Sequence, residues 1–80
     1  MIIDDNTHLM RIESEKGAYL ATIRSYVYSF SFDVLDQINK VLKSYEKYIA
    51  TPLDTMTLTS DYEFYEGEDL VATMTVFYRR

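Results

Sequence analysis

The chain has 80 residues, of which 48% are hydrophobic and 26% are charged, and its formal net charge at pH 7 is −5. This composition is typical of one globular domain, spanning 1–80, and excludes a low-complexity or intrinsically disordered chain. The absence of cysteine excludes a disulfide framework and a thiolate metal site, and it fits a reducing compartment.

The first predicted elements are two strands that form a hairpin. Residues 8–15 alternate between apolar and polar side chains, and residues 18–28 are rich in the Tyr, Val, Thr and Ile that strands favour. Lys16 and Gly17 predict a two-residue turn, because glycine readily adopts the positive φ that such turns need. One register gives both strands a shared apolar face; it pairs Ile12 with Ala21, Met10 with Ile23, Ser14 with Tyr19, and Glu15 with Ala18.

A helix is predicted from about Phe32 to Ile49, and the rest of the chain is organised around it. Its apolar residues recur with the 3.6-residue period of an amphipathic helix. Ser31 or Asp33 can cap its N-terminus, and Pro52 prevents its continuation. A single stripe must be buried against a sheet, so we expect it to supply half of the core. The stripe consists of Val34, Leu35, Ile38, Val41, Leu42, Tyr45 and Ile49.

Two further alternating strands are predicted over residues 55–65 and 70–78, with a turn at residues 66–69. A loop of three or five residues keeps their inward sets on one face, because side chains alternate with a period of two. The predicted fold is therefore α+β, of order ββαββ, with a four-stranded, mainly antiparallel sheet and one helix packed on one face. The inward sets are Met56, Leu58, Tyr62 and Phe64, and then Leu70, Ala72, Met74, Val76 and Tyr78.

One helix covers only one face of such a sheet, and the other predicted face is not wholly polar. Several apolar residues on one face indicate a contact surface, and so small a core is marginal alone. We expect a homodimer, or docking of a partner, through this face or a sheet edge. The candidate interface residues are Tyr65, Val71, Phe77, Tyr26 and Tyr28.

The sequence contains no motif for catalysis, metal binding or phosphate binding. The single histidine, His8, has Ser25 opposite it in the predicted register, but nothing completes a catalytic triad. An EF-hand loop starting at Asp61 would place Glu66 and Ala72 where glycine and glutamate are required. We therefore predict a non-enzymatic protein without a metal or cofactor. The sequence shows no signal peptide or membrane span, so we expect it in the cytoplasm.

The acidic residues are unevenly distributed along the chain. Residues 1–47 hold seven acidic and six basic residues, whereas residues 48–78 hold six acidic and no basic residues. Direct nucleic-acid binding needs a basic groove, so we do not expect it. Asp61 and Glu63 lie two positions apart on a strand, or about 6.6 Å, which is comparable with the spacing of successive phosphates. This pattern favours a basic protein as the partner, and a solubilising surface is the alternative. The candidate partner-binding residues are Glu63, Glu66, Glu68, Asp69 and Asp61, followed by Glu13, Glu15, Asp33 and Asp36.

The chain resembles the small acidic proteins that bacteriophages make early in infection, several of which mimic DNA and inhibit host DNA-binding proteins. The resemblance covers size, acidity and mixed α/β character. Glu13-Ser14 and Leu58-Thr59-Ser60-Asp61 are also similar to strands of the uracil-DNA glycosylase inhibitors. Those inhibitors continue Glu-Ser with an apolar residue where this chain has Glu15, so no family site is transferred.

The resemblance implies an inhibitor that occupies the DNA-binding surface of a basic host protein in the host cytoplasm. A nucleoid protein similar to HU is the first expectation. A structural or assembly module that dimerises without DNA mimicry is one alternative. An inhibitor of a DNA repair or restriction enzyme is the other.

Overall fold

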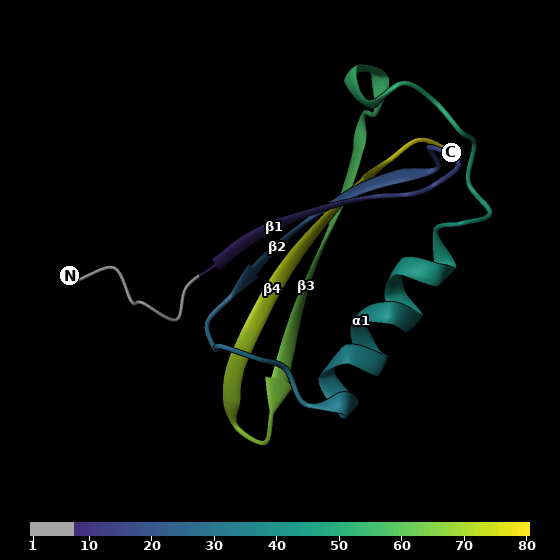
Figure 1. Cartoon of the computed structure of the whole chain (residues 1–80). Coiled ribbons are helices and arrows are strands. Elements are labelled where there is room, and N and C mark those ends of the chain that lie inside the picture. Colours follow the sequence, from purple (N-terminus) through teal and green to yellow (C-terminus); the bar gives the residue numbers. More distant parts are fainter. Residues whose placement is uncertain (1–7) are drawn as a thin grey trace.

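A single helix lies against one face of a four-stranded sheet in the computed structural model, which describes residues 8–80 (Figure 1). Neighbouring strands are antiparallel in the order β1-β2-β4-β3, which confirms the predicted α+β fold and places β4 inside the sheet. No helix in this part of the chain is long and apolar enough to cross a membrane. The elements are β1 (His8–Glu13), β2 (Tyr19–Ser25), α1 (Phe32–Ser44), the 3-10 turn η1 (Leu53–Thr55), β3 (Leu58–Glu66) and β4 (Asp69–Tyr78).

The predicted register of the first hairpin is confirmed, since Ile12 lies opposite Ala21 in the β1–β2 pair. The turn itself differs from the prediction. The amide of Gly17 donates to the carbonyl of Ser14 at 3.0 Å, so the turn closes over residues 15–16 instead of Lys16-Gly17. Gly17 keeps the expected positive φ, at +73°, and leads the chain back into β2.

β2 ends at Ser25 and does not continue to Tyr28 as predicted. The Ser25 hydroxyl donates to the carbonyl of Val27 at 2.7 Å and accepts from its amide at 3.3 Å. A serine side chain that bonds to the backbone two residues later turns the chain out of the strand direction. Tyr26 and Tyr28 therefore lie in the connection to α1, outside the sheet.

α1 begins as predicted and ends earlier. The Ser31 hydroxyl accepts from the amide of Val34 at 3.3 Å, which caps the N-terminus. The helix ends at Ser44, because the amides of Tyr45 and Tyr48 bond to carbonyls three residues back instead of four. This tighter winding turns the two rings toward the sheet and leaves Ile49 58% exposed, so the predicted extension of the stripe to Ile49 is wrong.

A β-bulge in β4 corrects the predicted pattern of the second hairpin. Phe64 pairs with Ala72 and Tyr65 pairs with Leu70, so Val71 is an additional residue in β4. Val71 is buried in the core and Leu70 is exposed, the reverse of their predicted orientations. The turn between the strands spans two residues instead of three or five, and the bulge supplies the odd residue that keeps both inward sets on one face.

The end of α1 is joined to the sheet by five tyrosines. The ring of Tyr45 lies 4.8 Å from that of Tyr78, 5.2 Å from that of Tyr48 and 6.4 Å from those of Tyr19 and Tyr62, measured between centroids. The hydroxyls of Tyr45 and Tyr62 are hydrogen-bonded. Burial, and then the bond to Tyr45, raise the pKa of Tyr62 to about 12, because both favour the neutral phenol.

Ile38→Asp should unfold the domain. Ile38 is 4% exposed at the centre of the α1 stripe, and an unpaired buried charge costs roughly 3–5 kcal/mol. A domain of this size has only about 4–12 kcal/mol of stability. Urea unfolding followed by circular dichroism measures the loss, with the exposed neighbour variant Asn39→Asp as the control. Equal stability of the two variants would contradict the placement of α1.

Stability should fall as the pH rises from about 10 to about 12. Tyr62 has a pKa of about 12 in the folded chain against a reference value of 10.0. The unfolded chain therefore loses the proton first, and the stabilisation present below pH 10 disappears through this window. Urea unfolding across this range measures the effect, and Tyr62→Phe should flatten the pH dependence. An unchanged profile in Tyr62→Phe would show that this hydroxyl does not carry the effect.

Candidate functional site

The strongest candidate site is the turn between β3 and β4, where three carboxylates fall within four residues. Glu66 and Asp69 are the last paired residues of the ladder and lie directly opposite each other. Glu68 lies in the turn, which begins at Gly67 with a φ of +65°. All three acidic side chains are exposed, and none of their carboxylates forms a hydrogen bond or ion pair with another described residue. We call Glu66, Glu68 and Asp69 the acidic tip.

The acidic tip costs the fold stability. Like charges directly opposite each other on neighbouring strands repel, whereas an opposite pair contributes roughly 0.2–1 kcal/mol. Glu66 and Asp69 form such a like-charged pair, and residues 48–78 contain no Lys or Arg to offset it. A cation supplied by another molecule would relieve this repulsion.

Asp61 and Glu63 lie further along β3, on the sheet face that α1 does not cover. The hydroxyl of Thr75 donates to Oδ1 of Asp61 at 2.6 Å, and the hydroxyl of Tyr65 donates to Oε1 of Glu63 at 3.1 Å. The bond to Glu63 and its negative charge raise the pKa of Tyr65, because they favour the protonated phenol. These contacts hold both carboxylates in place while leaving them exposed.

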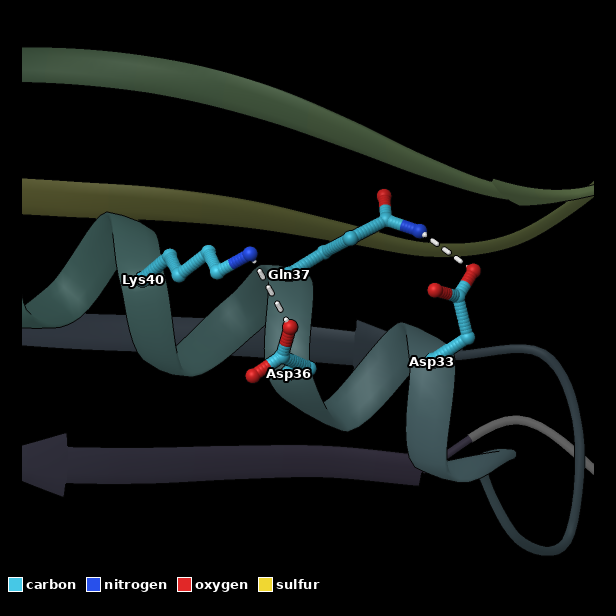
Figure 2. Close-up of polar contacts among 4 residues, drawn as sticks. All are labelled: Asp33, Asp36, Gln37 and Lys40. Atoms are coloured by element: carbon cyan, nitrogen blue, oxygen red, sulfur yellow. Dashed lines mark hydrogen bonds and ion pairs between the residues drawn. The ribbon is translucent and has the colours of Figure 1, made fainter.

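The other predicted acidic residues divide between the two ends of the molecule. Figure 1 shows that α1 begins beside the β3–β4 turn, which brings Asp33 and Asp36 to the same end as the acidic tip. Asp33 accepts a hydrogen bond from Nε2 of Gln37 at 3.0 Å, and Asp36 is paired with Nζ of Lys40 at 3.1 Å (Figure 2). Asp36 therefore has a basic neighbour on the helix surface, whereas the hydrogen-bond partner of Asp33 is an uncharged amide.

Glu13 and Glu15 lie at the opposite end of the sheet. Glu13 pairs with Leu20 beside the first turn, in the same part of the sheet as Phe77 near the end of β4. This end also carries Lys16 and the C-terminal arginines, so its charge is mixed. The structure therefore does not join Glu13 and Glu15 to the acidic tip in one surface.

Exposed apolar side chains accompany the acidic tip. Phe32 is 90% exposed at the start of α1, and Tyr65 and Leu70 form an exposed pair next to the turn. The connection from β2 is held here, because the amide of Tyr26 donates to the carbonyl of Val71 at 2.9 Å. Phe32 and Leu70 are not among the predicted site residues. Phe32 is an apolar residue outside the helical stripe, and this is the sequence feature that could have identified it as a contact residue.

The predicted interface residues have mixed outcomes. Tyr65 and Phe77 lie on the face opposite α1, as predicted, whereas Val71 is buried in the core and cannot form part of an interface. The face has a shallow depression of about 200 Å³, lined in part by Leu9, Arg24 and Thr73.

The arrangement brings exposed charge and exposed apolar side chains together at one end of the molecule. Within residues 8–80, no group of three His, Asp or Glu side chains is placed to hold a metal ion. The side chain of His8 lies outside the part of the chain that the structure describes.

No protein-family model, curated protein or solved structure shows a significant match to this chain. The functional interpretation therefore rests on the geometry of its own residues.

Proposed function

We propose that this chain is a non-enzymatic binding protein that inserts its acidic tip into the DNA-binding surface of a basic protein and thereby inhibits it. The observation that carries this proposal is that Glu66 and Asp69 lie directly opposite each other at an exposed turn. Both side chains are acidic, and neither forms an ion pair with another described residue. Carboxylates at this turn would take the place of DNA phosphates against the partner's Lys and Arg. A nucleoid protein similar to HU is the first candidate partner, and a DNA repair or restriction enzyme is the second.

The apolar residues next to the acidic tip support binding to a protein rather than to free cations. Large side chains that become buried at the centre of an interface supply most of its binding free energy. Phe32 and Leu70 are exposed beside the tip, where they would pack against the partner once the carboxylates have oriented it. Charge would then govern association rate and partner choice, and apolar contact would slow dissociation. The proposed inhibitor would act in the cytoplasm of the host cell.

A second candidate function is a structural or assembly module without DNA mimicry. The sheet face opposite α1 supports it, because Leu20 and Phe77 lie side by side there on neighbouring strands. In that case substitutions of Phe77 and Tyr65 would abolish function, whereas substitutions of acidic residues would affect only solubility.

Glu66→Lys should stabilise the fold while weakening partner binding. The substitution replaces a like-charged cross-strand pair with an opposite pair to Asp69, which is worth up to about 1 kcal/mol. Thermal unfolding at low salt measures the gain, with Glu15→Lys at the other end of the sheet as the matched control. A loss of stability in Glu66→Lys would show that the paired carboxylates are not in repulsive contact.

The double substitution Glu66→Lys and Glu68→Lys should abolish competition with DNA. The partner is first retained from a bacterial lysate on the immobilised chain, and labelled duplex DNA is then displaced from it by the free chain. Two like-charge contacts against the partner's cations should weaken displacement by at least about 100-fold. The wild type should compete best at low salt, because salt screens opposed charges.

The matched control is Glu15→Lys with Asp54→Lys, which makes the same change in net charge at exposed positions away from the acidic tip. The control should displace DNA nearly as well as the wild type. Equal loss in both double variants would show that only net charge matters, and a wild type that never displaces DNA would exclude mimicry.

A further inference from the structure

The sheet face opposite α1, which we call the open face, has its charges sorted by strand. Arg11 on β1 and Arg24 on β2 are its basic residues, and Asp61 and Glu63 on β3 are acidic residues on the other side. β1 and β3 are the two edge strands of the sheet. The open face therefore carries its two arginines on β1 and β2 and the acidic Asp61 and Glu63 on β3, with Glu13 as the one acidic residue on β1.

The ladder aligns these residues in rows that run across the sheet. In the middle row, Arg11 pairs with Thr22, Thr22 with Thr75, and Thr75 with Asp61. The row therefore reads base, hydroxyl, hydroxyl, acid from one edge to the other. Asp61 is held in this row by the 2.6 Å bond from Thr75.

The adjacent row has apolar residues at its centre. Leu20 on β2 pairs with Phe77 on β4, with Glu13 and Thr59 at the two edges. Leu20 and Phe77 are both half-buried by their neighbours in the sheet. The open face thus has an apolar and hydroxyl-bearing centre with charged edges, which is the arrangement of a protein–protein interface with its polar rim.

We propose that the open face binds a second copy of this chain around a twofold axis that runs parallel to the strands. Such an axis reverses the strand order, so that β1 of one copy lies over β3 of the other. Arg11 then faces Asp61 of the second copy at both edges, because the two residues share a row. In the centre, Leu20 faces Phe77 of the second copy. The charged ends of the middle row and the apolar centre of the adjacent row therefore meet complementary residues.

The other twofold axis, perpendicular to the strands, gives the opposite result. It places each strand over the same strand of the second copy. Around the middle row, Arg11 then faces Arg11 and Asp61 faces Asp61, which juxtaposes like charges at both edges. Since like-charge contacts across an interface cost several kcal/mol, the charge pattern selects the parallel axis. Two twisted sheets packed face to face keep their strands within about 30° of each other, which this axis allows.

The size of the open face predicts a reversible dimer. Four strands about 4.8 Å apart, with about seven residues of 3.3 Å each, cover roughly 450 Å² per copy. A typical stable interface buries about 800 Å² per partner. The dimer should therefore dissociate on dilution, and its affinity should depend on the charged edges.

The proposed dimer does not depend on the proposed function, but it would change how the acidic tip meets a partner. An axis parallel to the strands leaves the direction along the strands unchanged, so both copies point their acidic tips toward the same end. If the proposed function holds, the dimer presents two acidic tips side by side to one extended basic surface. A monomer would present only one.

Charge exchange at the edges tests the dimer, with analytical ultracentrifugation at low salt as the measurement. The wild type should shift from the 9.4 kDa monomer to the dimer as its concentration rises. Arg11→Glu and Asp61→Arg should each weaken dimerisation by at least about tenfold, because each creates two like-charge contacts. The combined variant should recover wild-type dimerisation to within about threefold, since it restores both pairs.

The control is Lys43→Glu on the exposed side of α1, which should dimerise as the wild type does, and circular dichroism confirms that each variant is folded. A wild type that remains monomeric at every concentration overturns the proposal, as do single variants that dimerise normally. A combined variant as weak as the single ones overturns the parallel axis. None of these substitutions alters the acidic tip, so DNA displacement by Arg11→Glu separates failure of the dimer from failure of the proposed function.

Discussion

The structure depends on one constraint, which is that a single short helix must close one face of a long sheet. The 13 residues of α1 extend for about 20 Å, whereas the ten residues of β4 extend for about 33 Å. The tyrosines after the helix cover part of the difference, because the tightened turns after Ser44 bring the rings of Tyr45 and Tyr48 against Tyr78. Large rings with a hydroxyl suit this position, since they bury apolar area while the hydroxyl of Tyr45 bonds to that of Tyr62 and the hydroxyl of Tyr78 to Ser60.

The same constraint explains where the functional surfaces lie. Since α1 packs on one face of the sheet, no helix in the described part of the chain covers the opposite face. That face carries the charged side chains of β1, β2 and β3. The β3–β4 hairpin is longer than the β1–β2 hairpin, so its turn extends beyond the sheet and exposes the acidic tip. The bulge at Val71 anchors this extension, because Val71 enters the core and its carbonyl holds the connection to α1 through Tyr26. The burial of Val71 in the core thus stabilises the hairpin in which Glu66 and Asp69 repel each other.

The sequence predicted those features that depend on local periodicity. The alternation around Ile12 and Ala21 was sufficient for the register of the first hairpin, and Ser31 was sufficient for the start of the helix. The end of the helix could not be predicted, because Tyr45 and Ile49 fit an ideal helical stripe and the change to three-residue bonding depends on packing against β4. The position of the bulge in β4 could not be predicted for a similar reason. Leu70, Val71 and Ala72 are consecutive apolar residues, and only pairing with β3 shows which one is the additional residue.

The acidic candidates show the same limit. Their identity followed from the charge of residues 48–78, but their grouping depends on the strand order. Because β4 pairs with β2, Glu13 lies at the far end of the sheet from Asp69. No local pattern could have separated the two sets. The sorting of Arg11 and Asp61 onto opposite edges is likewise a property of the ladder and cannot be read from neighbouring residues.

The central claim is that the acidic tip is the surface that meets a basic partner. The most direct measurement is an NMR titration of the isotopically labelled chain with the retained partner, in which backbone amide shifts report the contact surface. We predict that the changes concentrate at residues 66–70 and at the start of α1 around Phe32, and that added DNA reverses them. Changes centred on the first turn around Glu15, or changes that DNA does not reverse, would contradict it.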